Sequence, residues 1–229
     1  MPSLELLDVI QHAKPNILNI DPLETSKSLR KAKGSNKNYN MALDQIQAYC
    51  SGLQKLPDLL KFLRTHPNQE WHKYLEDVGT RLLDIFGNKP SVWYPTGRKP
   101  IESAGGLLIK PAIRGVWVSE SRVLPCVINA RSSVLLDSQC NLPFVARGVY
   151  ELHVRDLLGA TGSMVIDLGK DARTGLRANC IYFPTEAEMM SLEQFESISR
   201  KFDEALILAG LKSQAAASSI DLFRARKDN

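Results

Sequence analysis

Three acidic positions in the sequence have the chemistry to hold a divalent cation. Glu76 lies in an amphipathic segment, Asp137 precedes a second one, and Asp167 ends an apolar run with Lys170 close behind it. Carboxylate oxygens are the ligands that Mg²⁺ prefers. Each residue also has a plain structural explanation, since Glu76 is three residues from Lys73 on a helix surface, Asp137 suits a helix start and Asp167 precedes a turn. An isolated carboxylate is usually just exposed, so these are fallback metal ligands.

Basic residues gather in two parts of the chain and could contact phosphate groups. The first is residues 27–37, with Lys27, Arg30, Lys31, Lys33 and Lys37. The second is spread over expected turns and strand ends, and comprises Arg98, Lys99, Arg114, Arg122, Arg131, Arg147, Lys170, Arg173 and Arg177. Lysine and arginine neutralise nucleic-acid phosphates. The net charge is only +4, however, so an ordinary solvated surface is the alternative.

The sequence indicates no other catalytic chemistry. Its histidines are scattered, and it contains no GxSxG, Walker or HExxH pattern. The four cysteines have no CxxC spacing, so we expect thiols in a reducing compartment. No small-molecule cofactor is indicated.

The elements that must position these residues begin with helices. Helical patterns occur near residues 4–10, from Pro22 to about Gly34, over 40–51 and from Pro57 to before Pro67. A longer helix is predicted over 68–87, where apolar residues recur at helical spacing.

After residue 90 the pattern becomes mixed. We expect strands near residue 92 and over 107–118, 123–129, 163–168 and 179–183, with helices over 143–158 and 191–211. Ser191 and Gln194 form a capping-box pattern at the start of the last helix. Pro111 and Pro125 favour edge positions or bulges, because proline cannot donate to a strand ladder.

This order of one helix, three strands, a helix and a strand resembles the restriction-endonuclease-like, or PD-(D/E)XK, nuclease core over residues 68–211. The resemblance implies a central mixed sheet flanked by helices. In that family an aspartate and the glutamate of a Glu-x-Lys pattern hold a catalytic metal, while the lysine steadies the nucleophile. The matching positions here are Arg114 in the aspartate position, Asn129 in the glutamate position and Arg131 in the lysine position.

These substitutions predict that the family's metal site is lost. A guanidinium cannot deprotonate at accessible pH, so Arg114 would repel Mg²⁺, and Asn129 offers only a neutral oxygen. In a nuclease-like core Arg114 and Arg131 would lie together and could grip a phosphate. Strand alternation also places Asn129 and Arg131 on one face.

Three functions follow as hypotheses. The first is a catalytically silent nuclease-like domain that binds nucleic acid or acts within a nucleic-acid-processing assembly. The second is an active metal-dependent nuclease whose ligands have migrated, which would need Mg²⁺. The third is a protein–protein interaction or scaffold subunit, with its helices packed on a partner.

The predicted organisation is a helical N-terminal region over 1–66, a nuclease-like α/β core over 67–212 and a flexible basic tail over 213–229. An apolar fraction of 44% is ample for a buried core. No apolar run approaches the roughly 18 residues of a membrane span. We therefore expect a soluble, intracellular protein without membrane contact.

Overall fold

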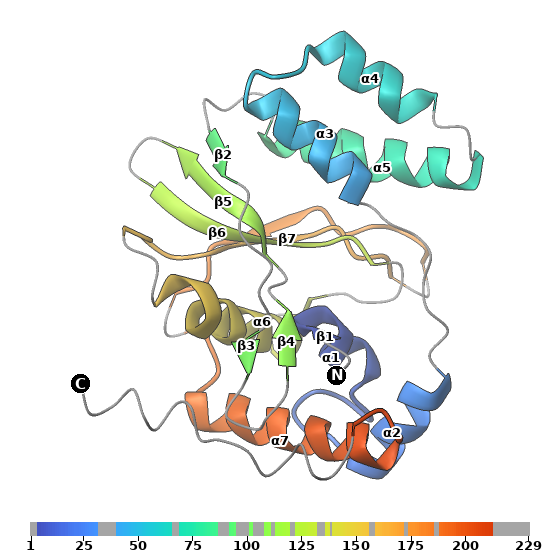
Figure 1. Ribbon diagram of the computed structural model, residues 1–229, viewed down its shortest axis with the longest axis vertical. Coiled ribbons are helices and arrows are strands. Elements are labelled where there is room, and N and C mark those ends of the chain that lie inside the picture. Colours follow the sequence, from blue (N-terminus) through green and yellow to red (C-terminus); the bar gives the residue numbers. More distant parts are fainter. Residues whose placement is uncertain are drawn as a thin grey trace.

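The chain forms a mixed α/β fold with an open sheet between helical layers (Figure 1). The computed structural model describes residues 4–31, 40–65, 69–86, 92–94, 101–102, 108–110, 113–119, 122–131, 136–137, 139–155, 159–171, 174–185 and 188–212. The helices are α1 (Leu6–His12), α2 (Pro22–Lys31), α3 (Asn40–Cys50), α4 (Leu56–Arg64), α5 (Gln69–Phe86), α6 (Asn141–Val149), the π-helix η1 (Tyr150–Val154) and α7 (Leu192–Leu208). The strands are β1 (Leu4–Glu5), β2 (Val92–Tyr94), β3 (Ile101–Glu102), β4 (Leu108–Lys110), β5 (Ile113–Ser119), β6 (Arg122–Asn129), β7 (Met164–Asp167) and β8 (Cys180–Tyr182).

The main sheet has the strand order β2-β5-β6-β7-β8. Neighbouring strands are antiparallel except β6 and β7, which run parallel. Parallel neighbours need a crossover, and here it contains α6. As a result β6 and β7 end at the same edge of the sheet, where Asn129 pairs with Asp167.

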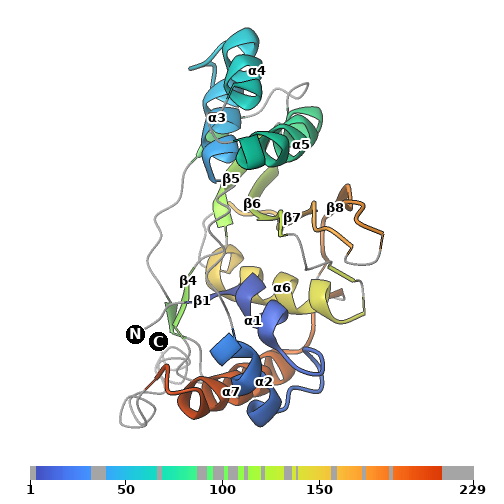
Figure 2. The ribbon, with the colours of Figure 1, turned by 90° about the vertical axis from the view of Figure 1, so that its right-hand side faces the viewer.

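The two faces of this sheet carry separate apolar clusters. Alternate residues of a strand point to opposite faces, so Val127 and Val165 contribute to one cluster and Ile128 and Ile166 to the other. The first cluster contains residues of α1, α2, α6 and α7, and the second contains residues of α3, α4 and α5. Figure 2 shows the same layering from the side.

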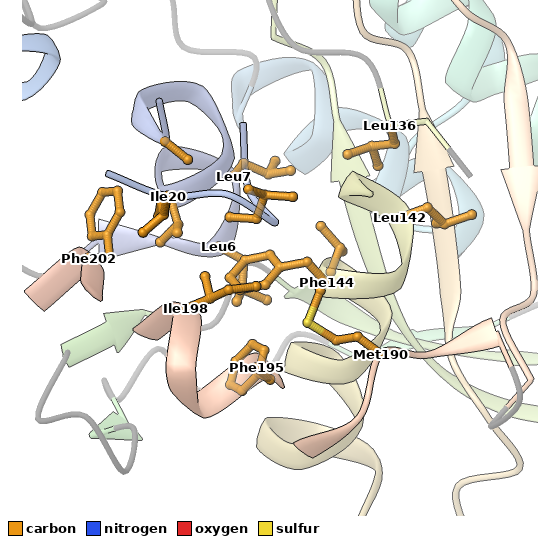
Figure 3. Close-up of a cluster of buried hydrophobic side chains, with 14 of the residues drawn as sticks. Leu6, Leu7, Ile20, Leu136, Leu142, Phe144, Met190, Phe195, Ile198 and Phe202 are labelled. Atoms are coloured by element: carbon orange, nitrogen blue, oxygen red, sulfur yellow. The ribbon is translucent and has the colours of Figure 1, made fainter. Parts of the chain in front are cut away.

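The cluster beneath the sheet is closed by aromatic packing between α6 and α7. The rings of Phe144 and Phe195 lie 5.1 Å apart, and Leu6 and Leu7 of α1 are packed beside them (Figure 3). Gly148 lets the Leu6 side chain pack closely against α6, since a Cβ at residue 148 would lie 2.6 Å from Leu6 Cδ2. The N-terminal helix is therefore part of the core beneath the sheet.

Most of the predicted elements are confirmed. Helices α1 to α5 and the strands β2, β6, β7 and β8 lie where the patterns predict them, within a few residues. The capping box also forms, since the Gln194 amide nitrogen lies 3.1 Å from Ser191 Oγ and the Ser191 amide lies 3.2 Å from Gln194 Oε1.

Three expectations about the second half of the chain are corrected. The single strand predicted over 107–118 is two strands in different sheets, because β4 pairs with β1 and β3 while β5 joins the main sheet. The helix predicted over 143–158 begins at Asn141 and changes to a π-helix at Tyr150. Pro125 lies in an interior strand, but it precedes Cys126, the first residue of β6 that pairs with β7. The missing N–H therefore falls before that ladder begins.

Helices from the predicted N-terminal helical region cover both faces of the sheet. α1 and α2 pack beneath it with α6 and α7, whereas α3 and α4 pack above it with α5 (Figure 1). The boundary near residue 66 and the flexible tail over 213–229 stay predictions, and the tail lies outside the described residues. Across the part of the chain described, no helix combines the length and apolarity required to cross a bilayer.

Candidate functional site

The candidate site lies at the edge of the sheet where β6 and β7 end together. Asn129 and Asp167 are the last residues of these strands and are direct partners in the parallel register. Asn129 Nδ2 donates a 2.7 Å hydrogen bond to Asp167 Oδ1. Asn129 is fully buried and Asp167 is 2% exposed, so this hydrogen bond belongs to the interior.

Among the described residues, three groups donate hydrogen bonds to Asp167. Besides Asn129, the Gly169 amide donates to Oδ1 and the Leu136 amide donates to Oδ2, each at 2.8 Å. The two oxygens of a carboxylate have about four acceptor positions, so three of them are used by the protein itself. Asp167 therefore links the end of β6, the turn after β7 and Leu136, which precedes α6 in the chain.

Asn129 also shapes the chain beyond β6. Its Oδ1 accepts a hydrogen bond of 3.2 Å from the Arg131 amide, and its carbonyl accepts one of 2.7 Å from the Leu168 amide. The Arg131 carbonyl then accepts from the Lys170 amide at 3.0 Å. Hydrogen bonds therefore bring Asn129, Arg131, Asp167 and Lys170 to one place.

The Arg131 side chain is paired with the N-terminal helix. Its Nη1 lies 2.7 Å from Asp8 Oδ1 and 2.7 Å from Gln11 Oε1, both on α1. The Arg131 and Asp8 side chains are 20% and 25% exposed. This partly buried ion pair fastens α1 to the end of β6.

His12 ends α1 near this ion pair. Its Nδ1 lies 3.3 Å from Ser28 Oγ of α2. Burial lowers the pKa of His12, and the nearby Arg131 and Lys14 charges lower it further, although Asp8 opposes them. The folded protein therefore favours the neutral imidazole at this position.

A second arginine closes the same edge from the opposite face. Arg177, whose side chain is 6% exposed, pairs through Nε with Asp77 of α5. Its Nη1 donates to the Ala130 carbonyl at 3.2 Å and to the Leu168 carbonyl at 2.7 Å. Asp77 also accepts from Arg81 at 2.9 Å. Burial raises the pKa of Asp77, but the hydrogen bonds from Arg81 and Arg177 outweigh it and the net pKa is lowered.

The other predicted metal ligands already have partners within the protein. Glu76 is on α5 and lies 3.8 Å from Arg64 Nε. Asp137 accepts from the Gln139 and Cys140 amides at 3.1 and 2.7 Å, in the turn that precedes α6. Among the described residues, no three His, Cys, Asp or Glu side chains come together as a metal site.

The structure describes only the backbone of Arg114. It lies in the irregular part of β5 between Ile113, which pairs with Val127, and Gly115, which pairs with Cys126. Its side chain lies outside the described residues, so the meeting of the Arg114 and Arg131 guanidiniums stays a prediction.

The basic segment over 27–37 is described as far as Lys31, and Lys33 and Lys37 lie outside the described residues. Lys27 pairs with Glu24 at 2.6 Å, and both side chains are about half exposed, at 55% and 54%. Arg30 donates to the Leu208 carbonyl at the end of α7, while Lys31 is exposed at the end of α2. Within α2, Lys27 and Lys31 therefore present charge to solvent, and Arg30 also fastens α2 to α7.

Sequence reasoning missed Asp8, Gln11 and Asp77 as partners of the arginines. One signal was present, because Asp77 and Arg81 are spaced i, i+4 beside the apolar stripe of α5. The Asp8–Arg131 pair has no local signal, since the two residues meet only through the tertiary fold.

No family model, curated protein or solved structure shows a significant match to this chain.

Proposed function

We propose that this chain is a catalytically silent nuclease-like domain that binds nucleic acid, alone or within a nucleic-acid-processing assembly. The observation that carries the proposal is that Asn129 and Arg131, which occupy the family's glutamate and lysine positions, are engaged in contacts within the protein. Asn129 and Asp167 are hydrogen bonded to each other at 2.7 Å, and Arg131 is paired with Asp8. The strand order β2-β5-β6-β7 with its single parallel pair also supports the resemblance.

Binding of nucleic acid is attributed to exposed basic residues rather than to this closed edge. Lys27 and Lys31 are exposed, whereas Arg131 and Arg177 are largely committed to internal ion pairs. Contacts of exposed lysines with phosphates contribute affinity without sequence preference. We therefore expect weak, salt-dependent binding to unrelated sequences.

Fluorescence anisotropy with labelled DNA and RNA at several salt concentrations tests this function. The double variant Lys31→Glu, Lys33→Glu should weaken binding equally for unrelated sequences and lower the salt slope by about one for each phosphate that is no longer neutralised. The double change Lys55→Glu, Lys61→Glu, at two exposed lysines of α4 and its N-cap, is the matched charge control. Unchanged binding in the double variant would show that residues 27–37 are an ordinary solvated surface.

Cleavage assays with Mg²⁺ and Mn²⁺ separate the remaining functions. The proposal expects no divalent-dependent cleavage by the wild type. Robust cleavage that survives Arg114→Ala would favour an active nuclease with migrated ligands, with Glu76, Asp137, Asp167 and Lys170 as the next residues to replace. Absence of both cleavage and nucleic-acid binding would favour a protein-interaction scaffold.

A further inference from the structure

A pocket of about 620 Å³ opens at the edge of the sheet opposite to the Asn129–Asp167 pair. It is formed where β6 begins, where β7 begins and where the chain leaves β8, with η1 on one side. This volume is within the range of small-molecule sites, roughly 300–1,000 Å³. None of the residues discussed for the candidate nuclease site lines it.

The charged side chains among the described residues of the pocket lining are both arginines, Arg122 and Arg155. Arg122 is exposed at the start of β6. Arg155 is 47% exposed and uses one nitrogen in a 3.3 Å contact with Glu151, which leaves other guanidinium donors for a ligand. Two guanidiniums at one pocket favour an anion, and a phosphate above all.

An aromatic ring stands beside this positive charge. The Arg122 guanidinium carbon lies 5.5 Å from the centre of the Phe183 ring, which is 44% exposed. A guanidinium over an aromatic ring forms a planar cation–π platform, and such platforms stack the bases of nucleic acids. The pocket therefore joins an anion-binding element to a surface for a planar ring.

A buried hydroxyl lines the same pocket. Ser163 is 2% exposed, and its Oγ has no hydrogen-bond partner within the described chain. Leaving a buried polar group unsatisfied is unfavourable, so native proteins usually supply a partner from protein, water or ligand. A ligand hydroxyl or phosphate oxygen would be such a partner.

The pocket wall is fixed by the fold. The Thr161 amide donates to the Val123 carbonyl at 3.0 Å, and the Val123 amide donates to Thr161 Oγ1 at 3.2 Å. Gly162, with φ of 149°, turns the chain from this contact into β7. On the other side, Tyr150 and Val154 come from the π-helix η1, and π-helical turns occur frequently at functional sites.

From these observations we propose that the pocket binds a nucleotide. Its phosphate is held by Arg122 and Arg155, its base stacks on the Arg122–Phe183 platform, and a polar ligand atom satisfies Ser163. A simple phosphate would leave the aromatic ring and the pocket volume unused, and an uncharged ring would leave both arginines without an anion. The nucleotide can be a free mononucleotide or one unit of a single-stranded nucleic acid.

This site does not depend on the function proposed above. The basic segment over 27–37 is tested by DNA and RNA binding and its salt slope. The pocket is tested by a mononucleotide, which is too small to contact both the pocket and this segment. Loss of one type of binding therefore leaves the other to be judged separately.

Isothermal titration calorimetry of the full chain with four probes tests the assignment. AMP carries both base and phosphate, adenosine lacks the phosphate and ribose 5-phosphate lacks the base. A 5′-phosphorylated adenine tetranucleotide is the strand probe. We expect AMP to bind at least about tenfold more tightly than adenosine or ribose 5-phosphate, because each lacks one of two independent contacts. A further gain for the tetranucleotide would assign the pocket to a strand, and equal or weaker binding would assign it to a free nucleotide.

Variants then separate the two contacts. Arg122→Ala should weaken AMP binding about tenfold or more, since it removes a charge-assisted contact. Phe183→Leu keeps apolar volume and should weaken AMP binding several-fold while leaving ribose 5-phosphate binding unchanged. Ser163→Ala should weaken AMP binding without lowering thermal stability, because it removes an unsatisfied hydroxyl. Arg200→Ala, an exposed arginine of α7 outside the pocket lining, is the control and should bind AMP like the wild type.

Two results would overturn the proposal. One is the absence of binding of both AMP and the tetranucleotide to the wild type at millimolar concentration. The other is AMP binding that is the same in the wild type, Arg122→Ala and Phe183→Leu, with thermal unfolding showing that both variants are folded.

Discussion

Arg131 and Asp8 form a 2.7 Å ion pair that fastens the first helix of the chain to the end of the central strand β6. The pair determines what Arg131 can do. The Nη1 nitrogen, which contacts both the Asp8 carboxylate and Gln11, must exchange these contacts before it can bind a phosphate. The arginine that the sequence offers as a phosphate ligand thus has an internal structural role.

Breaking this pair should destabilise the fold measurably. We expect Arg131→Ala to lower the free energy of unfolding by about 1–3 kcal/mol, between the usual values for exposed and buried pairs. Urea denaturation of Arg131→Ala, Asp8→Ala and the double variant gives the coupling energy. Lys27→Ala, which breaks the exposed pair with Glu24, is the control and should cost well under about 1 kcal/mol. Additive effects of the Arg131 and Asp8 changes would contradict the pairing.

Replacing Asn129 by aspartate should create a pair of carboxylates that can hold a divalent metal. The variant places two carboxylates where a 2.7 Å hydrogen bond now holds Asn129 to Asp167. Their repulsion and the absence of that hydrogen bond should cost at least about 2 kcal/mol at neutral pH. Mn²⁺ should restore part of that stability, and the melting temperature with and without Mn²⁺ measures it.

Asn129→Ala is the matched control, because it removes the same hydrogen bond without adding a carboxylate. A rise in its melting temperature with Mn²⁺ equal to that of Asn129→Asp would show that the metal binds elsewhere. The triple variant Arg114→Asp, Asn129→Glu, Arg131→Lys should likewise gain at least weak divalent binding by calorimetry. Cleavage need not return with it, since poorly held sites lose catalysis.

Stability should fall as the pH is lowered through the range of an ordinary histidine. The pKa of His12 is lowered in the folded protein from a usual value of 6.5, so the unfolded chain binds more protons than the folded chain below that pH. Its contribution is therefore complete above pH 6.5 and is lost progressively as the pH falls toward the folded pKa. Unfolding midpoints measured from pH 8 to 5 for the wild type and His12→Gln test this. Identical pH profiles would exclude His12 as the cause.

Replacing Arg177 should lower the free energy of unfolding more than the position of this residue in a turn implies. Arg177→Ala would leave the Ala130 and Leu168 carbonyls without this donor and Asp77 without one of its partners. We expect a loss of about 2–4 kcal/mol in urea denaturation. Arg177→Lys should restore little, because a single ammonium cannot reproduce the fork that spans Asp77 and two carbonyls. Full rescue by lysine would reduce the role of Arg177 to charge alone.

The sequence allowed prediction of elements whose signals are local. The capping box at Ser191 and the apolar spacing of α5 depend on residues three or four positions apart, and both elements form as predicted. The pairing of Asn129 with Asp167 was not predicted, although each residue was expected at the end of a strand. The sequence also gives no indication that the Leu136 and Gly169 amides donate to the Asp167 carboxylate.

Other features were not predictable because they depend on distant contacts. β1 and β3 are two-residue strands that exist only by pairing with β4, and such short segments carry no period. The π-helical turn at Tyr150 has no sequence pattern in an otherwise apolar helix. The pocket between the starts of β6 and β7 likewise gathers Arg122, Arg155 and Phe183 from three separate segments.

The placement of α1 and α2 has a consequence for synthesis of the chain. α1 packs against α6, and α2 packs along α7, the last helix described (Figure 1). On the ribosome the apolar faces of the first helices are made long before the segments that cover them. They must remain uncovered, or protected by chaperones, until the C-terminal part emerges. Contacts of such wide sequence separation slow folding, so the layer beneath the sheet should be the last part to acquire its native packing.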